Sequence, residues 1–428
     1  MYAGVSLDQA PPEDIPFRFF LSAPIFGVIV GLLIAFNGKS LFSSSWDLEV
    51  VALTHAITLG WLASIMIGAF YQMVPVLVGG TVPYIFFSRV VHAVFTIGVL
   101  LIIGGLYFFT TAALHGGTFL LLLAFIFFIV QLGIALFRVK PDRPTVVAMM
   151  ISLISLAITV IIGILFAGNY AGWWSVSMER TQIIGIHLTF GLFGWVTTLI
   201  MGVGFHIIPM FYLTPVFPVA KAKKVLQLMT LSLALVPLCL FFGFNTFWLI
   251  LAAIPGFSAM ILFVKTTRHM FNQRKRKVMD TTIRCWQLGL ISLPLSLVFL
   301  LLYQIWPISA FAFIFAFFFL IGFALAITSG MLYKIVPFLV WFHRFSMLIG
   351  KVPVPLLKDI SPDKNARLQW KFLTIAMITL LLAVILGFDL ATRLGGLLLA
   401  ASSLHLFINL VKMVRIKTPE VPLQAPEG

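Results

Sequence analysis

Six positions recur three times in this chain with identical spacing, each time inside an apolar segment long enough to cross a membrane. Their order is glycine, aromatic residue, glycine, aromatic residue, polar residue and proline. The first glycines are residues 60, 194 and 322, so successive copies are offset by 134 and 128 residues. A pattern repeated at a nearly constant period predicts three homologous blocks. The copies are Gly60, Trp61, Gly68, Tyr71, Gln72 and Pro75; Gly194, Trp195, Gly202, Phe205, His206 and Pro209; and Gly322, Phe323, Gly330, Tyr333, Lys334 and Pro337.

Composition excludes a soluble domain. Of the 428 residues, 61% are hydrophobic and 10% are charged, with a mean hydropathy of +1.12, whereas soluble domains are roughly half apolar and about a quarter charged. The composition therefore predicts a polytopic membrane protein. Its formal net charge of +15 comes from basic residues between apolar runs, so it predicts topology and not a nucleic-acid partner. The two cysteines form no CxxCH motif for covalent haem.

Apolar runs of spanning length predict an all-α fold of about twelve transmembrane helices in three pseudo-repeated four-helix arcs. The repeated motif falls on helices 2, 6 and 10. We expect a cytoplasmic segment 1–16, one membrane domain 17–416 with blocks near 17–140, 145–270 and 281–416, and a cytoplasmic tail 417–428. The predicted helices are 17–36, 50–78, 90–109, 117–137, 145–167, 182–212, 225–242, 247–263, 285–303, 308–342, 372–386 and 390–411.

Basic residues are concentrated in alternate connections, which predicts that those connections are cytoplasmic. Both termini should then be cytoplasmic, in a protein integral to a bilayer such as a bacterial inner membrane. The segment 351–371 is expected to be the one sizeable internal loop. The basic connections are 138–143, 221–224, 265–284 and 344–371, whereas the opposite ones contain only Lys39, Arg180 and Arg393.

The repeated motif combines residues that bend and pack helices with one polar position. The prolines lie inside helices and should kink them, and the glycines should let neighbouring helices approach closely. Gln72, His206 and Lys334 occupy the polar position in turn. Lys334 either extends toward the cytoplasmic interface or joins a proton or anion path with the other two, its charge matched by water or a carbonyl.

His55 and His187 lie about two turns inside the outer ends of their helices, where an imidazole needs a partner. His187 is seven residues before Gly194 and His55 is five before Gly60, so together they spell H-x-H-x4-G. The other histidines favour less specific interpretations. We place His115 in an outer loop, His269 in an inner loop, His343 at an interface, and His92 and His405 in packing roles, with His206 and His92 a conceivable but less favoured metal pair.

This layout resembles the haem-copper oxidase subunit I superfamily, including the nitric oxide reductases, over nearly the whole chain. Members have twelve helices in three four-helix arcs, with haem-ligating histidines on helices 2, 6 and 10. The run His187-Leu-Thr-Phe-Gly-Leu-Phe-Gly-Trp, followed by His206-Ile-Ile-Pro, also looks like the NnrS family, haem-containing membrane proteins of the nitric oxide response.

Two departures limit what the resemblance implies. The predicted helix 225–242 has no histidine, whereas the oxidases place a copper-binding pair there. Phe315 and Phe317 stand where helix 10 of the family would place its two haem histidines. We therefore do not expect a haem-copper binuclear centre of the usual kind, and copper binding stays open.

The resemblance also implies a specific haem site. Histidines two residues apart project to nearly opposite sides of a helix, at about 100° per residue. Carried through the repeat, the family's arrangement turns His55 toward helix 6 and His187 toward helix 2, so both become axial ligands of one haem b. Arg180 or Arg393 would meet its propionates. The competing interpretation is that the histidines bond to helix carbonyls or to each other.

The leading functional hypothesis is a b-type haem membrane protein acting in electron transfer, haem-based sensing or the nitric oxide response, with a donor protein or quinol as partner. If it is an enzyme, it is an oxidoreductase, but not a complete oxygen or nitric oxide reductase. The alternative is a transporter or channel with a polar pathway through Gln72, His206 and Lys334, because repeats with interrupted helices also occur in transporters. A non-catalytic assembly subunit is the third possibility.

Overall fold

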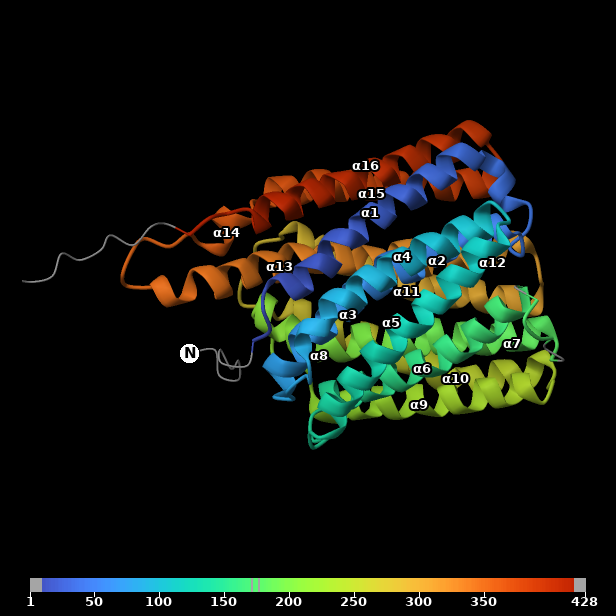
Figure 1. Cartoon of the computed structure of the whole chain (residues 1–428), viewed down its shortest axis with the longest axis horizontal. Helices are drawn as coiled ribbons and strands as arrows, with labels where there is room; N and C mark the ends of the chain where they lie inside the picture. The colour runs from blue at the N-terminus through green and yellow to red at the C-terminus, as the bar shows by residue number, and fades with distance from the viewer. Residues whose placement is uncertain (1–9, 171, 176–177, 419–428) are drawn as a thin grey trace, which may run out of the picture.

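The computed structural model describes residues 10–170, 172–175 and 178–418. Most of the predicted terminal segments, residues 1–9 and 419–428, lie outside the described residues. Within the described part the chain is all-α, and twelve helical spans are long and apolar enough to cross a membrane (Figure 1). The predicted fold class, an all-α polytopic membrane protein, is confirmed.

We number the spans 1 to 12 in chain order. They are α1 (Asp14–Asn37) with η2 (Gly38–Phe42); α2 (Leu48–His55), η3 (Ala56–Ala63), α3 (Ser64–Met73) and η4 (Val74–Val78); η5 (Ile85–Phe87) with α4 (Ser88–Tyr107); α5 (Thr111–Phe137); α6 (Pro144–Tyr170); α7 (Arg180–Leu188), η6 (Thr189–Thr197) and α8 (Thr198–Tyr212); α9 (Val219–Phe241); α10 (Thr246–Asn272); α11 (Thr281–Ile305); α12 (Ser309–Ala316), η7 (Phe317–Leu325) and α13 (Ala326–Arg344); α15 (Asp363–Leu386); and α16 (Asp389–Val414). Two short helices, η8 (Ser346–Leu348) and α14 (Leu357–Ile360), precede α15.

Several helices begin earlier than the apolar runs predicted. α15 begins at Asp363 and not near residue 372, because its polar first turns lie outside the apolar window. The predicted loop 351–371 therefore contains α14 and the start of α15. For the same reason His115 lies in the second turn of α5 and His269 in the last turn of α10, where loops were expected.

Large apolar side chains cover the outside of the bundle, which is the surface that a bilayer requires. Examples at interior helix positions are Phe127, Ile161 and Ile378, each at least half exposed. The apolar surround supports an integral membrane location.

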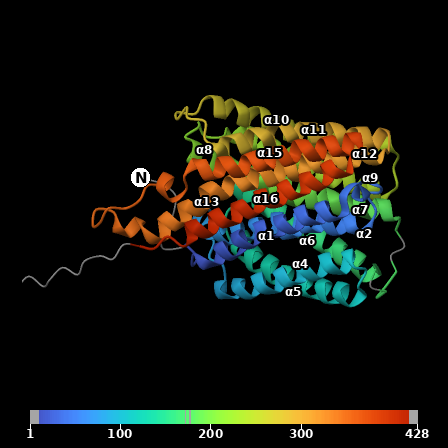
Figure 2. The same ribbon diagram turned by 90° about the horizontal axis from the view of Figure 1, so that it is seen from above.

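The twelve spans form a ring of three four-helix blocks. The fourth helix of each block packs on the first helix of the next, namely α5 on α6, α10 on α11 and α16 on α1. The last contact joins the two ends of the chain, and Figures 1 and 2 both show α16 lying beside α1. The three four-helix blocks expected from the repeat are therefore arranged in a closed ring.

The spans carrying the motif, 2, 6 and 10, meet one another at the centre. The Trp61 indole N–H donates to Thr328 Oγ1 at 3.0 Å, joining span 2 to span 10. The rings of Phe70 and Trp195 stack at 5.4 Å between spans 2 and 6. Phe193 and Phe319 are in edge contact, also at 5.4 Å, between spans 6 and 10. The repeated helices are therefore the core of the fold.

Both motif glycines of each block face the first helix of their own block. A Cβ on Gly60 or Gly68 would meet the Phe26, Phe19 or Phe20 side chains of α1. The corresponding contacts in the other blocks are Gly194 with Ser155 and Gly202 with Ala148, both on α6, and Gly322 with Ser292 and Gly330 with Cys285, both on α11. The close-packing role expected of the glycines is confirmed.

The second motif aromatic contacts the fourth helix of its own block. Tyr71 Oη donates to Gln131 Oε1 on α5 at 2.8 Å, and Tyr333 Oη accepts from Asn409 Nδ2 on α16 at 2.9 Å. In the middle block the ring of Phe205 lies 6.1 Å from that of Phe263 on α10. Each motif therefore ties its helix to both edges of its block.

Each motif helix contains a π-helical segment at the first glycine and aromatic residue of the motif. These segments are η3, η6 and η7. π-Helices are rare in proteins overall, but many of those known lie at functional sites. Their wider turn inserts an extra residue and shifts the side chains that follow. The repeat is thus one of backbone geometry as well as of sequence.

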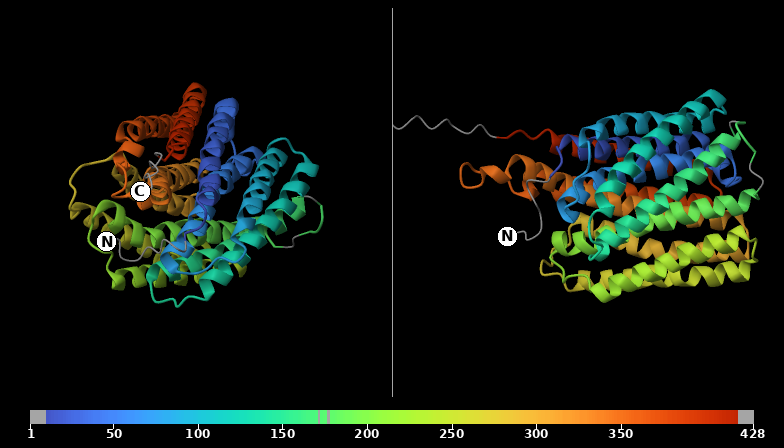
Figure 3. Two further views of the ribbon diagram at one scale, coloured as in Figure 1. Left: turned by 60° about the vertical axis from the view of Figure 1, so that its left-hand side comes forward. Right: turned by 60° about the horizontal axis from the view of Figure 1, so that its bottom comes forward.

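The basic connections and the described ends of the chain lie at one end of the bundle, called here the basic end (Figure 3). Arg344, the last residue of α13, ties these ends together. Its guanidinium bonds to Glu13 and donates to the backbone oxygens of Val414 and Ile416, each at 2.7 Å. The predicted placement of the two ends on one side is therefore seen, whereas which compartment they face stays a prediction.

Candidate functional site

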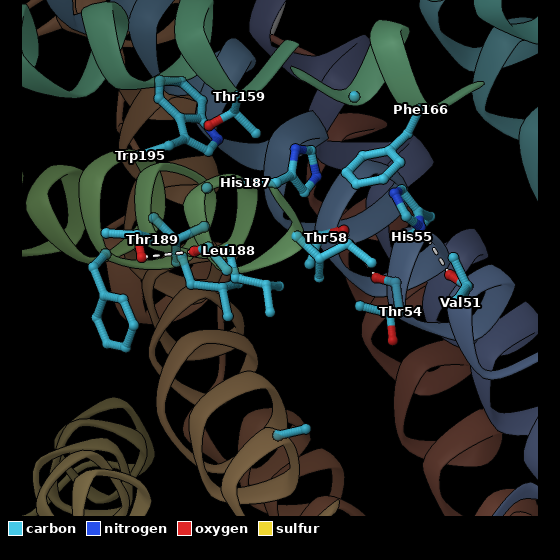
Figure 4. Close-up of a pocket in the computed structure, with 18 of the residues that line it drawn as sticks. Val51, Thr54, His55, Thr58, Thr159, Phe166, His187, Leu188, Thr189 and Trp195 are labelled. Atoms are coloured by element: carbon cyan, nitrogen blue, oxygen red, sulfur yellow. Dashed lines mark hydrogen bonds between the residues drawn. The ribbon is translucent and has the colours of Figure 1, made fainter. Parts of the chain in front are cut away.

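A cavity of about 690 Å³ lies among the helices and opens at the end opposite the basic end. It falls within the range of roughly 300–1,000 Å³ typical of sites for small ligands and cofactors. Its walls come from spans 2 to 10 and are mainly apolar. Both His55 and His187 line it, so the structure brings together the two histidines that the sequence analysis paired (Figure 4).

The two histidines enter the cavity at matching depths from different helices. His55 is seven residues from the first residue of α2, and His187 is seven residues from the first residue of α7. At 1.5 Å per residue each lies about 10 Å inside its helix. A π segment follows His55 directly and begins two residues after His187. The spans therefore present equivalent imidazoles to one space.

His55 is oriented by its own helix. Its Nδ1 forms a 2.8 Å hydrogen bond with the backbone oxygen of Val51. A carbonyl oxygen only accepts, so Nδ1 carries the proton and Nε2 is left with a lone pair. A histidine bonded to a helix carbonyl was the competing interpretation of this residue, and the same bond also orients metal-binding histidines.

The His187 ring occupies space that Gly163, which has no side chain, leaves open on the neighbouring helix α6. A Cβ on Gly163 of α6 would lie 3.2 Å from Cε1 of the His187 ring. Nδ1 of His187 is buried with no hydrogen-bond partner among the described residues. The backbone of Thr159 on α6 is the polar group within weak hydrogen-bonding reach of this ring, so the imidazole is held only loosely by the protein.

Threonines add polarity to the cavity wall without offering hydroxyl protons. Thr54 and Thr58 donate to the carbonyls four residues earlier at 2.8 and 2.9 Å. Thr159 and Thr189 do the same, both at 2.7 Å. In the view of Figure 4 the Phe166 ring lies between the two imidazoles. The sequence analysis missed these residues, because nothing in their spacing separates them from ordinary helix positions.

The mouth of the cavity carries one charged side chain among its described lining residues, Arg180. Its guanidinium lies over the rings of Trp46 and Tyr170, at 5.4 and 5.7 Å from their centroids, and donates to the Tyr170 hydroxyl. An arginine so placed suits an anionic group at the mouth. The expected position of Arg180 near the two histidines is therefore observed.

Arg393 does not share this position. It bonds to Asp389 at 2.7 Å and donates to the carbonyls of Ala35 and Phe36 at the end of α1. It is not among the lining residues of the cavity. Its contacts are those of a helix cap, and they remove it from the expected propionate position.

Lys334 is paired with a carboxylate, where water or a carbonyl was expected. Its Nζ lies 2.7 Å from Asp280 Oδ2, and 5.4 Å from the ring centre of Tyr212. Asp280 also caps α11 by accepting from the Ile283 N–H at 3.1 Å. An Asp just before an apolar run is typical of a helix start, so the sequence could have identified Asp280 as a cap. Its pairing with Lys334 could not be predicted, because 54 residues separate the two.

Gln72 and His206 occupy other surroundings. The Gln72 side chain is buried and its Oε1 has no hydrogen-bond partner among the described residues. His206 is exposed on α8. The described hydrogen bonds connect neither of them to Lys334, so the three motif positions do not form a continuous polar chain.

Metal-binding clusters of the usual size are absent from the described part of the chain, where no three His, Cys, Asp or Glu side chains are grouped. His92 bonds to Ser22 Oγ at 3.3 Å and is in edge contact with Phe19 at 4.8 Å. This is the packing role favoured for His92.

Phe315 and Phe317 stand where the resembled family has its two haem histidines on helix 10. Phe315 lines the cavity and Phe317 is buried.

The fold and the cavity together define a class: a twelve-helix integral membrane protein with paired histidines in a central apolar cavity. No family model matches the chain, and a comparison with curated proteins finds no match.

Proposed function

We propose that this protein binds one haem b in the central cavity and transfers electrons within the membrane, with His55 and His187 as the axial ligands. The observation that carries the proposal is the presence of two imidazoles, from separate motif helices, on the wall of one apolar cavity. Paired histidines at membrane depth are costly unless something binds them.

The donor set fits a haem. His55 keeps its proton on Nδ1, which leaves Nε2 as a neutral ligand atom, the form that metals bind. His187 Nδ1 has at most a weak contact with the Thr159 backbone, and the bare Gly163 leaves room at the ring. The Phe166 side chain would have to rotate away from the space between the two rings. Arg180 would hold a carboxylate at the mouth.

Two protein ligands favour electron transfer over turnover of a small molecule. A haem supplies a one-electron redox centre when bound. His55 and His187 would fill both axial positions, which leaves none for oxygen or nitric oxide. The proposal therefore ranks electron transfer above sensing or a nitric oxide response, and it requires a donor protein or a quinol.

The visible spectrum of the purified protein tests the proposal. We expect a Soret band with sharp reduced α and β bands, and we expect His55→Ala and His187→Ala each to abolish this low-spin spectrum. His115→Ala and His269→Ala are the controls and should retain it, because neither side chain lines the cavity. A colourless preparation, or a six-coordinate bis-histidine spectrum retained by both single variants, would contradict the assignment.

The transporter hypothesis gains no specific support. Its three residues are not linked by described hydrogen bonds, and the charge of Lys334 is neutralised by Asp280. A polar pathway requires a connected series of polar groups or water. We therefore keep transport as the alternative to be considered if the preparation is colourless.

A further inference from the structure

A second cavity, of about 600 Å³, lies at the basic end between the first helix of the middle block, α6, and the third, α9. We call it the α6–α9 groove. It is separate from the histidine cavity and shares no lining residue with it. Its lining residues are Pro141, Asp142, Arg143, Pro144, Val147, Ile151, Lys223, Leu226, Gln227, Thr230, Leu231 and Ala234.

The groove is as deep as one leaflet of a bilayer. Its lining on α9 runs from Lys223 to Ala234, eleven residues, or about 16 Å at 1.5 Å per residue. Half of a hydrocarbon core of about 30 Å is about 15 Å. The groove therefore extends from the membrane surface to about the bilayer midplane.

Polarity changes along this depth in the order found in a phospholipid. Arg143 and Lys223 provide cations at the mouth, together with the Asp142 carboxylate. Gln227 and Thr230 lie one and two turns deeper and offer uncharged polar groups. The walls beyond are aliphatic, from Ile151, Leu231 and Ala234. Charged head group, ester region and acyl chain would meet these three zones in turn.

The charges at the mouth call for an anion. α9 has three lysines, 221, 223 and 224, in its first two turns and no acidic residue in the first turn. A helix N-terminus is positive, so lysines there are unfavourable and an anion is favoured. α6 likewise begins with no acidic residue in its first turn. Asp142 is the one carboxylate in the lining.

In the other two blocks, polar side chains join the equivalent pair of helices. In the first block Asp14 of α1 bonds to Arg89 of α4 at 2.8 Å. In the third block Asp363 of α15 accepts from the Thr281 N–H of α11 at 2.8 Å, and Arg284 lies over the Trp370 ring at 5.3 Å. α6 and α9 also pack on each other, but the described hydrogen bonds and ion pairs include none between these two helices, and the groove lies beside their contact.

We infer that the α6–α9 groove binds one anionic phospholipid from the leaflet at the basic end, with its phosphate at Lys223 and Arg143 and one acyl chain along Ile151, Leu231 and Ala234. Basic pockets between transmembrane helices are known sites for anionic head groups. The inference does not depend on the haem proposal, because the groove and the histidine cavity share no lining residue.

Native mass spectrometry of the purified full-length chain, delipidated and then titrated with defined lipids, tests the inference. The probes are phosphatidylglycerol and phosphatidylcholine with identical acyl chains. We expect one phosphatidylglycerol per chain to be retained at energies that strip phosphatidylcholine. Equal retention of the two lipids would overturn the inference. So would displacement of the bound lipid by inorganic phosphate, because the site would then recognise the anion without the acyl chain.

Two variants separate the head-group and acyl-chain contacts. Lys223→Gln should weaken phosphatidylglycerol binding about fivefold, the effect expected of one cation near the membrane surface. Lys221→Gln is the matched control, because it removes the same charge two residues away on the same helix, outside the lining, and should change binding less than twofold. Equal losses in both variants would mean general surface attraction and overturn the inference.

Ala234→Phe fills the deep end of the groove and leaves every cation in place. It should lower phosphatidylglycerol retention by at least the same factor, because the acyl chain no longer fits. A variant that retains its lipid at the wild-type level would contradict the proposed depth. Since position 234 is exposed, the substitution does not disturb the packed core, and folding is checked by the thermal unfolding midpoint in the same detergent.

Discussion

Lys334 and Asp280 illustrate how a single residue at membrane depth obtains a partner. Their side chains are 22% and 20% exposed, and they meet at 2.7 Å. We predict that Lys334→Met lowers the free energy of unfolding by about 1–3 kcal/mol, because it leaves a largely buried carboxylate without its cation. The thermal unfolding midpoint in detergent measures this. Lys358→Met, at an exposed position, is the control and should stay within about 0.5 kcal/mol of wild type.

A double variant tells whether the two charges act on each other. Lys334→Met with Asp280→Asn should be less destabilised than the sum of the two single variants, since no charge is left unpaired. Strict additivity would show that the ion pair contributes nothing. In that case Lys334 stabilises the fold through the Tyr212 ring alone.

Gly163 provides a test of the histidine site that leaves both histidines in place. A side chain at this position crowds Cε1 of His187 at 3.2 Å. We predict that Gly163→Val shifts the visible spectrum from low-spin toward high-spin, because the His187 ring is pushed from its position. Gly133→Val is the control, since a Cβ there meets nothing within 4 Å. An unchanged low-spin spectrum in Gly163→Val would remove His187 from the site.

The sequence predicted which candidate residues lie together better than it predicted their partners. His55 and His187 were paired through the family resemblance, with Arg180 or Arg393 expected beside them, and His55, His187 and Arg180 line one cavity. Asp280 was missed because a carboxylate 54 residues away reaches Lys334 only through the folding of span 10 against span 9. Arg393 was assigned to the same end of the bundle, but position along the membrane normal does not fix which neighbour a side chain meets.

At the scale of the helix, the glycines were predictable and the π segments were not. Gly60, Gly194 and Gly322 are small residues in apolar helices, a pattern that by itself indicates close packing. A π turn requires one extra residue in the hydrogen-bonding ring, which leaves no compositional trace. The coincidence of η3, η6 and η7 with one motif shows that the repeated spacing carries this backbone geometry.

Substitutions at the motif glycines test the packing that this geometry serves. A Cβ on Gly202 would overlap the Cβ of Ala148, and one on Gly330 would lie 2.6 Å from the Cβ of Cys285. We predict that Gly202→Ala and Gly330→Ala each cost about 1–3 kcal/mol of unfolding free energy through overpacking. Gly133→Ala, a helical glycine in open space, should instead be neutral or stabilise by up to about 1 kcal/mol. Similar thermal midpoints for all three would contradict this.

Over the whole molecule, hydropathy predicted the number and order of the spans because a bilayer requires about twenty apolar residues for each crossing. It failed at helix starts such as that of α15, where a charged turn extends beyond the apolar layer. The ring closure between α1 and α16 was not predicted, because repeated blocks can also stack in an open array, and only the structure shows that the two ends meet. The groove between α6 and α9 had no sequence signal, since sequence spacing does not show which helix pairs are joined by polar side chains, as α1–α4 and α11–α15 are.

The orientation of the ring in the membrane follows from charge. The basic end carries the connections around residues 138–143, 221–224, 265–284 and 344–371, and the opposite end has far fewer cations. Cytoplasmic connections of membrane proteins carry an excess of Lys and Arg. We therefore predict that the basic end, with both ends of the chain, faces the cytoplasm. The mouth of the histidine cavity then faces the opposite compartment.

Cysteine labelling of whole cells tests this orientation with little background, because the native thiols of Cys239 and Cys285 are both buried. Val278→Cys places a thiol at an exposed position of the basic end, and Phe388→Cys places one at an exposed position of the opposite end. An impermeant maleimide should label Phe388→Cys in intact cells and Val278→Cys only after permeabilisation. The reverse pattern would invert the topology and move the cavity mouth to the cytoplasmic side, where an electron donor would have to approach Arg180 from within the cell.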